Sequence, residues 1–119
     1  MNEIQNALVA LRHAPGVTGS AVVTNDGLVA ASSLADGFDR DVIAGLSSYL
    51  MMATNRSLEN GGYGHCSKLL LNATHGKAVF VQLDESYLVV LFDHCAEISD
   101  ADGEVDEAAD RIRGASRLA

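Results

Sequence analysis

Two adjacent histidine–cysteine pairs are the residues of this sequence whose types could do chemistry: His65-Cys66 and His94-Cys95. Imidazole and thiolate are ligands that zinc prefers, so two such pairs could supply one four-ligand zinc site. Neighbouring residues of a strand point to opposite faces of a sheet, however, so His65 and Cys66 cannot readily hold the same ion. Structural zinc ligands are typically spaced about two to four residues apart. We therefore expect no metal site.

The same pairs could instead form a thiol nucleophile with a histidine base, but that chemistry also needs a third group to orient the histidine. Spacing alone identifies no such group. The more ordinary interpretation is that both cysteines are reduced and behave as small buried hydrophobes. A disulfide between Cys66 and Cys95 would require neighbouring strands, and a reducing compartment disfavours it. The sequence leaves open whether the two cysteines are adjacent. We expect no catalytic residue and no cofactor, with a zinc or thiol enzyme as an alternative.

Two further patterns imitate ligand-binding motifs without matching them. The glycine-rich run at residues 61–64 follows a predicted helix and enters a predicted strand. Phosphate-binding loops run the other way, from a strand into the N-terminus of a helix. The acids at residues 100–107 do not keep the register of a calcium-binding loop. We interpret the first pattern as a helix stop and the second as a solvated helix face.

The charge and hydropathy of the chain exclude several classes of partner. The 119 residues carry a formal net charge of −8, so the surface would repel both nucleic acid and anionic membranes. Glu3 and Gln5 interrupt any apolar start of the signal-peptide type. No stretch reaches about 18 uninterrupted apolar residues. We expect a cytoplasmic protein of one domain, residues 1–119, with no nucleic-acid partner and no membrane insertion.

Hydrophobic periodicity predicts elements in the order α-β-β-α-β-β-β-α. We expect helices at residues 3–13, 39–60 and 99–118, and strands at residues 17–24, 28–33, 66–73, 78–83 and 87–92. Asn25-Asp26-Gly27 predicts a hairpin with a type I′ turn, which needs positive φ angles. The last strand is almost entirely apolar, so it should lie centrally and be covered on both faces. The predicted fold class is α/β, an α+β sandwich with a five-stranded antiparallel sheet and helices on both faces.

The predicted helix at residues 39–60 carries two apolar stripes. At about 100° per residue, one broad arc holds the residues expected to cover the sheet, which are Val42, Ile43, Leu46, Tyr49, Leu50 and Ala53. A helix on the surface of a monomer needs only one stripe, so the second stripe predicts a seam between two helices. The predicted interface residues are Ala44, Ser47, Ser48, Met51, Asn55 and Leu58. The alternative is that these are scattered exposed residues of no significance.

Several segments, in this order, resemble the Roadblock/dynein light chain domain family. Residues 15–23 and 26–32 (Pro-Gly-Val-Thr-Gly-Ser-Ala-Val-Val and Asp-Gly-Leu-Val-Ala-Ala-Ser) resemble its first hairpin. Residues 45–53 resemble the small-residue middle of its long helix, and residues 88–93 resemble its last strand. The likeness covers residues 3–118. It departs from the family pattern after Asp93, where His-Cys-Ala-Glu replaces the expected glycine-containing connection.

The resemblance implies a Roadblock/profilin-like fold and a homodimer, or a heterodimer of two related domains, with a continuous sheet and paired long helices. It also implies a small Ras-like GTPase as partner. We therefore expect a non-catalytic, prokaryotic regulator or scaffold of such a GTPase. Whether it is also a GTPase-activating protein stays open, and Arg40 and Arg56 are the candidate arginine fingers on the long helix. The alternatives are a small-molecule-sensing profilin-like or longin-like domain and a constitutive scaffold.

Overall fold

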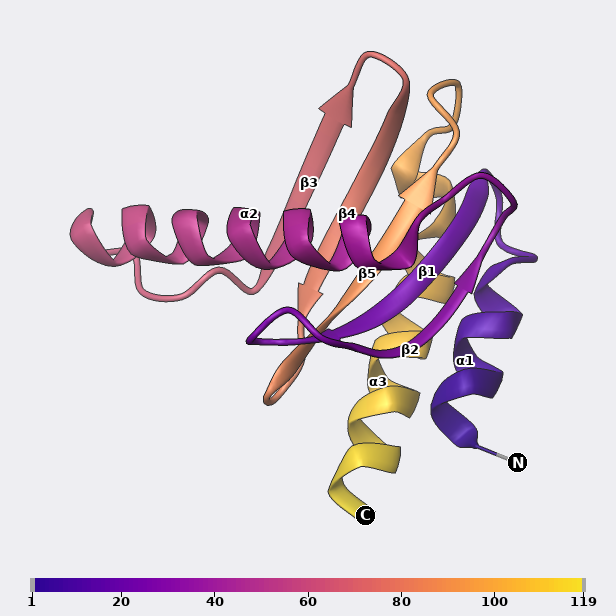
Figure 1. Cartoon of the computed structure of the whole chain (residues 1–119), viewed down its shortest axis with the longest axis horizontal. Helices are drawn as coiled ribbons and strands as arrows, with labels where there is room; N and C mark the ends of the chain where they lie inside the picture. The colour runs from indigo at the N-terminus through magenta and orange to yellow at the C-terminus, as the bar shows by residue number, and fades with distance from the viewer. Residues whose placement is uncertain (1, 119) are drawn as a thin grey trace.

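The computed structural model describes residues 2–118 and contains a five-stranded antiparallel sheet between helices (Figure 1). Its elements are α1 (Glu3–Leu11), β1 (Val17–Thr24), β2 (Val29–Leu34), α2 (Arg40–Asn60), β3 (Lys68–Ala73), β4 (Gly76–Gln82), β5 (Ser86–Phe92), the short 3-10 helix η1 (Ile98–Ala101) and α3 (Asp102–Leu118). The predicted α-β-β-α-β-β-β-α order and the predicted fold class are confirmed. The strands lie in the order β2-β1-β5-β4-β3, so the apolar β5 is central, as expected, and β2 and β3 form the edges.

The helix boundaries follow local capping chemistry. The Asn2 side chain accepts hydrogen bonds from the first turn of α1, and Asp39 does the same for α2, because the first amides of a helix have no internal partner. α1 ends at Leu11, two residues before the predicted boundary. There the amides of residues 12–14 bond to carbonyls three residues back, which tightens the chain before Pro15. The predicted last helix begins instead with η1, and only then continues as α3.

The β1–β2 hairpin forms as predicted, but its turn is not of type I′. Gly27 has a φ of 89°, and among the described residues only glycines have a positive φ. Asp26 therefore does not adopt the positive φ that a type I′ turn requires at this position. The Gly27 amide donates to the Thr24 carbonyl at 2.9 Å, and the Thr24 amide donates to the Leu28 carbonyl at 2.8 Å. This is the pattern of a type I turn followed by a left-handed glycine, which also fits the twist of a hairpin.

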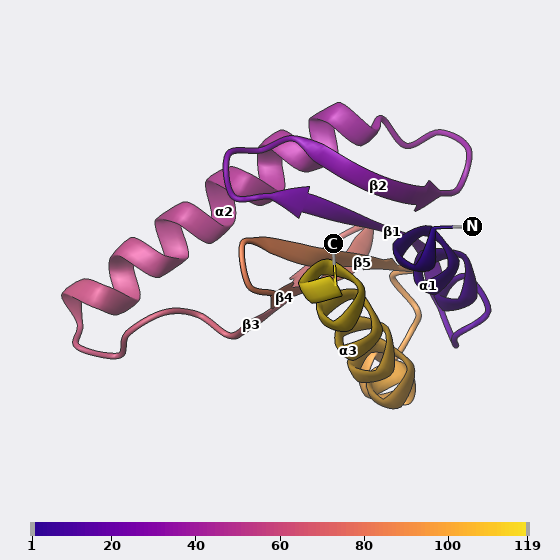
Figure 2. The same ribbon diagram turned by 90° about the horizontal axis from the view of Figure 1, so that it is seen from below.

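The two faces of the sheet are covered differently. α1 and α3 pack side by side on one face, and α2 crosses the other face alone (Figures 1 and 2). We call these the α1/α3 face and the α2 face. The larger core lies on the α1/α3 face and includes Leu8, Val79, Leu88, Val90 and Ile112, all with no exposed surface. The core of the α2 face is smaller and includes Ala44, Met51, Cys66, Phe80 and Tyr87.

Within residues 2–118 we find no helix that combines the length and the apolar character needed to cross a membrane.

Candidate functional site

The orientation of α2 differs from the orientation that we predicted. Ala44, Ser47 and Met51, expected at a seam between two helices, are only 1–3% exposed because they face the sheet of their own chain. Ala44 and Ser47 are small, which lets the helix backbone approach the strands closely. Side chains that are buried within the protomer cannot contact a partner. The prediction that this stripe faces outward is therefore wrong.

The other three predicted interface residues are half-buried and hold α2 to its neighbours. The Ser48 hydroxyl donates to the Asn25 carbonyl of the hairpin turn at 3.4 Å. The Asn55 side-chain carbonyl accepts the Cys66 amide at 2.7 Å, just before β3. Leu58 packs against the core of the α2 face. Each of these residues has a role in the fold of the protomer.

The stripe that we expected to cover the sheet points largely into solvent. Val42 is 56% exposed, Leu46 60% and Tyr49 65%, and Met52 beside them is 53% exposed. We call these four residues the outer α2 face. Ile43 and Leu50, from the same predicted stripe, lie at its border and are half-buried against the core. A row of large apolar side chains in solvent is characteristic of an interaction surface.

The edge strand β3 is a second exposed apolar feature. It pairs with β4 on one side, and it ends the sheet on the other. Leu70 and Leu71 in this strand are both exposed. The free edge of a sheet presents a row of amide and carbonyl groups that can pair with another strand. β3 is therefore suited to adding a strand from a second molecule.

The outer α2 face and the β3 edge are brought together by the direction of α2. In both views the helix crosses the sheet, and its C-terminal end extends past β3 (Figures 1 and 2). Next to Phe38, which precedes α2, lies a shallow hollow of about 470 Å³, whose lining also includes Leu71, Ala73 and Leu91. One side of the molecule thus combines a projecting helix, an open strand edge and an apolar depression.

Tyr87 is a buried polar residue under α2. Its hydroxyl has no hydrogen-bond partner among the described residues, although it lies close to Ser48. Burial raises the pKa of the Tyr87 hydroxyl above its usual value, and the nearby Ser48 hydroxyl opposes that rise. A buried hydroxyl without a partner costs free energy of folding.

The two histidine–cysteine pairs lie at opposite ends of the sheet. β3 and β5 both run antiparallel to β4, and Cys66 precedes β3 whereas Cys95 follows β5. Both cysteines are free, and this separation rules out a disulfide between them or one zinc site shared by both pairs. Cys66 is buried, as predicted. Cys95 is exposed, so the prediction that both thiols are buried is wrong for this residue.

Known proteins resemble this chain both in sequence and in fold. The uncharacterized protein MJ0310 of Methanocaldococcus jannaschii is 32% identical over 110 residues, which are 92% of this chain and 96% of that protein. The structure of MglB from Myxococcus xanthus aligns with a TM-score of 0.91 at 14% identity, covering 100% of this chain and 98% of that one.

Two further structures show the range of the fold. An MglB structure described as having a tetrameric arrangement aligns with a TM-score of 0.86 at 16% identity, covering 97% of this chain and 88% of that one. Profilin II of Acanthamoeba castellanii aligns with a TM-score of 0.58 at 14% identity, covering 96% of each chain. Residues 3–92 match the family model described as Roadblock/LC7 domain. The predicted resemblance is therefore confirmed, and the chain belongs to the Roadblock/LC7 domain family.

Proposed function

We propose that this chain is a non-catalytic, homodimeric regulator or scaffold that binds a small Ras-like GTPase. The observation that carries the dimer is the exposed outer α2 face beside the open β3 edge. The GTPase rests on the family resemblance. The MglB structure with a tetrameric arrangement supports self-association among proteins of this fold.

The geometry of one protomer favours a two-fold dimer. If the β3 strands of two copies pair antiparallel, their sheets join and both α2 helices lie on the same face. The end of each helix that extends past β3 would then lie over the partner's sheet, beside the hollow next to Leu71 and Leu91. A two-fold interface uses the same patch on both copies, and this patch contains both the projection and the depression.

The dimer is tested by placing a charge on the outer α2 face. We expect Leu46→Asp to convert the dimer to monomer in light scattering, because a carboxylate buried at the seam would lose its hydration at a cost of roughly several kcal/mol. Val9→Asp is the matched control, since Val9 is also an exposed apolar residue on a helix, on the opposite face of the sheet. Circular dichroism should show folded protein for both variants. A wild-type monomer at micromolar concentration would contradict the proposal.

The GTPase would use a surface that exists only in the dimer. Two α2 helices related by a two-fold axis form a composite surface, and one asymmetric partner on the axis would contact both copies. We therefore expect two protomers per GTPase. Switch segments of a GTPase are ordered by contacts with the γ-phosphate, so a protein that recognises the ordered form binds the GTP state more tightly.

The partner is tested by titrating the dimer with the cognate small GTPase, loaded either with a non-hydrolysable GTP analogue or with GDP. We expect tighter binding to the GTP-analogue form, and loss of binding with Leu46→Asp but not with Val9→Asp. Equal affinity for both forms would instead indicate a constitutive scaffold.

Arg40 and Arg56 are both exposed. If the dimer stimulates hydrolysis by arranging the GTPase's own residues, Arg56→Ala should leave the stimulated rate nearly unchanged.

A further inference from the structure

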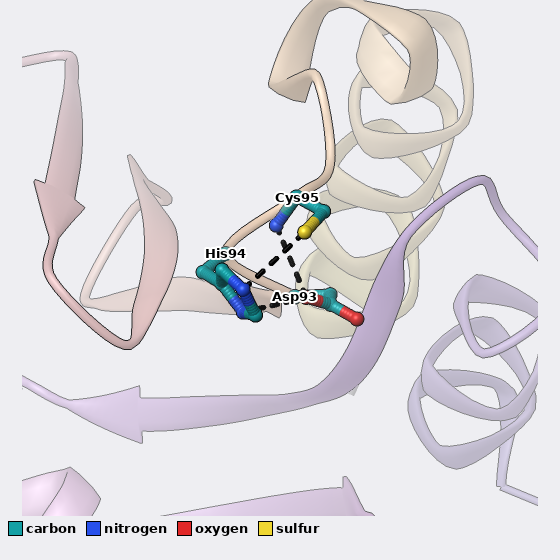
Figure 3. Close-up of side chains that lie close together, drawn as sticks. All are labelled: Asp93, His94 and Cys95. Atoms are coloured by element: carbon teal, nitrogen blue, oxygen red, sulfur yellow. Dashed lines mark hydrogen bonds and ion pairs between the residues drawn. The ribbon is translucent and has the colours of Figure 1, made fainter.

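Asp93, His94 and Cys95 form a cluster at the turn that follows β5 (Figure 3). His94 Nε2 lies 3.3 Å from Cys95 Sγ, and His94 Nδ1 lies 3.0 Å from Asp93 Oδ1. The same carboxylate oxygen accepts the Cys95 amide at 3.0 Å. The ligand atoms of all three side chains lie within 4.8 Å of one another. The imidazole therefore lies between a carboxylate and a thiol, with one ring nitrogen close to each.

The turn explains how adjacent residues can meet. On a strand, two adjacent side chains point to opposite faces and cannot readily bind the same ion. His94 and Cys95 instead lie in a turn between β5 and η1. The turn is anchored at both ends, because the Asp93 amide donates to the Gly16 carbonyl at 3.0 Å and Lys77 Nζ donates to the Ala96 carbonyl at 2.6 Å.

The distances fit coordination of a metal ion. Zinc binds thiolate at about 2.3 Å and imidazole nitrogen at about 2.0–2.1 Å, so tetrahedral geometry separates the two ligand atoms by about 3.5 Å. His94 Nε2 and Cys95 Sγ are 3.3 Å apart. A histidine that binds a metal usually donates its other ring N–H to a carboxylate, which fixes the tautomer and the ring orientation. Asp93 is in that position relative to His94 Nδ1.

The donor set and its exposure define the class of ion. Thiolate and imidazole together favour zinc-like ions over magnesium or calcium, which prefer oxygen ligands. The Asp93 and His94 side chains are both more than half exposed, so an ion can enter from solvent and keep water in its remaining positions. Binding requires the thiolate, so the Cys95 thiol would release its proton to solvent as the ion binds.

The geometry points to a binding site for a thiophilic divalent cation of the zinc class at this turn. His94 Nε2 and Cys95 Sγ are the direct ligands, and Asp93 is the positioning residue that orients His94. The site lies outside the outer α2 face, so its occupancy does not depend on the proposed function.

The test is calorimetric titration of metal-free, reduced protein with Zn²⁺, with Mg²⁺ as the comparison ion. We expect one zinc ion per chain and no measurable binding of Mg²⁺ at the same concentrations. Cys95→Ser and His94→Gln should each weaken zinc binding by about 100-fold or more. Asp93→Asn keeps an acceptor for the Cys95 amide, and should weaken binding by about 10–100-fold through the loss of the carboxylate behind His94. These side chains are exposed, so the variants should fold.

Controls separate this site from adventitious binding. Cys66→Ala removes the other thiol and His75→Gln removes another exposed histidine, and neither should change the zinc affinity. Titration in two buffers of different ionisation enthalpy should show release of about one proton per ion near neutral pH, as expected for a thiol that becomes a thiolate ligand. Lack of saturable binding, or equal zinc affinity in wild type and Cys95→Ser, would overturn the proposal. Light scattering of the same samples tests the dimer independently.

Discussion

Helices cover the two faces of the sheet to different extents. On the α1/α3 face, two helices and the strands enclose a core that is aliphatic except for Phe92 and that includes Leu8 and Ile112. On the α2 face, a single helix crosses the sheet and leaves an apolar hollow uncovered between Phe38 and the end of β3. One face thus has the closed core that a protomer needs to fold. The other face leaves apolar surface in water, and this difference supports the proposed dimer.

The side chains that α2 and α3 expose to solvent differ in the same way. α3 buries Val105, Ala108, Ala109 and Ile112 and turns its acidic residues to solvent, as expected for a helix that covers a core and meets water. α2 buries Ala44 and Met51 yet exposes four large apolar side chains on its opposite side. Within residues 2–118 the second apolar side of α2 meets no other element, and this supports the proposed dimer.

The largest effect on stability should come from a cavity in the core of the α1/α3 face. Leu88 lies at the centre of the α1/α3 core with no exposed surface. We expect Leu88→Ala to lower the free energy of unfolding by about 2–5 kcal/mol, because the substitution removes apolar burial and leaves a cavity. Leu28→Ala, at an exposed leucine in the hairpin turn, should change it by about 0.5 kcal/mol or less. Urea denaturation of both variants measures the difference. Similar losses of unfolding free energy in the two variants would show that Leu88 is not enclosed in a packed core.

Two adjacent methionines test the orientation of α2. Met51 is buried against the sheet and Met52 is exposed. Met51→Ala should lower the free energy of unfolding by about 2 kcal/mol or more, because the buried side chain leaves a void. Met52→Ala should instead weaken the dimer, seen as a higher dissociation constant in analytical ultracentrifugation, with little loss of fold. If Met52→Ala were the more destabilising of the two, the helix would face the other way, as the sequence analysis predicted.

A smaller effect is expected at the β3 edge. Leu70 is exposed on the edge strand, and its side chain points to the α1/α3 side, away from α2. Leu70→Lys should weaken the dimer by about tenfold, or roughly 1.4 kcal/mol, because a lysine on an edge strand opposes pairing with another strand. Asn72→Lys, further along the same exposed stretch of β3, shows whether the effect depends on the replaced leucine. An unchanged dimer in both variants would indicate that the helices alone form the interface.

The orientation of α2 was not predictable from apolar periodicity, because both of its stripes are apolar. A second signal was present in the sequence. Arg56 lies at the edge of the arc that we expected to cover the sheet, next to Tyr49, whereas the stripe from Ala44 to Leu58 contains no charged residue. Burying an arginine without a partner is costly, so the stripe without charge is the better candidate for the core. By contrast, the central position of β5 was predicted correctly, because one unbroken apolar strand admits only one interpretation.

The backbone conformation of the turns was the other feature that the sequence did not determine. Asp26-Gly27 correctly predicted a hairpin, but a dipeptide does not determine whether one or both residues adopt positive φ. The cluster at residues 93–95 was missed for a related reason. Alternation along a strand was considered for His65-Cys66, whereas His94-Cys95 follow the predicted strand at residues 87–92 and lie in a turn, where adjacent side chains can converge. In both the hairpin turn and the 93–95 cluster, the outcome depends on the local backbone conformation, which is set by tertiary contacts.

The smallest expected effect lies at the rim of the closed face, where Arg117 of α3 contacts Asp84 in the β4–β5 turn. Arg117 Nε lies 2.9 Å from Asp84 Oδ2, and Nη2 lies 3.1 Å from Oδ1, which is a two-point contact. These hydrogen bonds from Arg117 are the largest influence and lower the pKa of Asp84. Burial opposes them, and the charges of Arg117 and Arg113 lower the pKa further, so that the net shift is downward. Both partners are exposed, so solvent screens the interaction and its contribution to stability is small.

The pH dependence of this contact has a definite sign. The folded chain holds the Asp84 pKa below that of the unfolded chain, which is about 3.9. The stabilisation is therefore fully present above that value, and it is lost as the pH falls through the lower pKa of the folded state. Asp84→Asn should thus lower the melting temperature slightly at pH 7, and the difference from wild type should shrink as the pH approaches 2. High salt at pH 7 should also shrink it, because salt screens exposed charges. A difference between variant and wild type that persists at pH 2 would mean that the substitution acts through the conformation of the turn and not through the charge of Asp84.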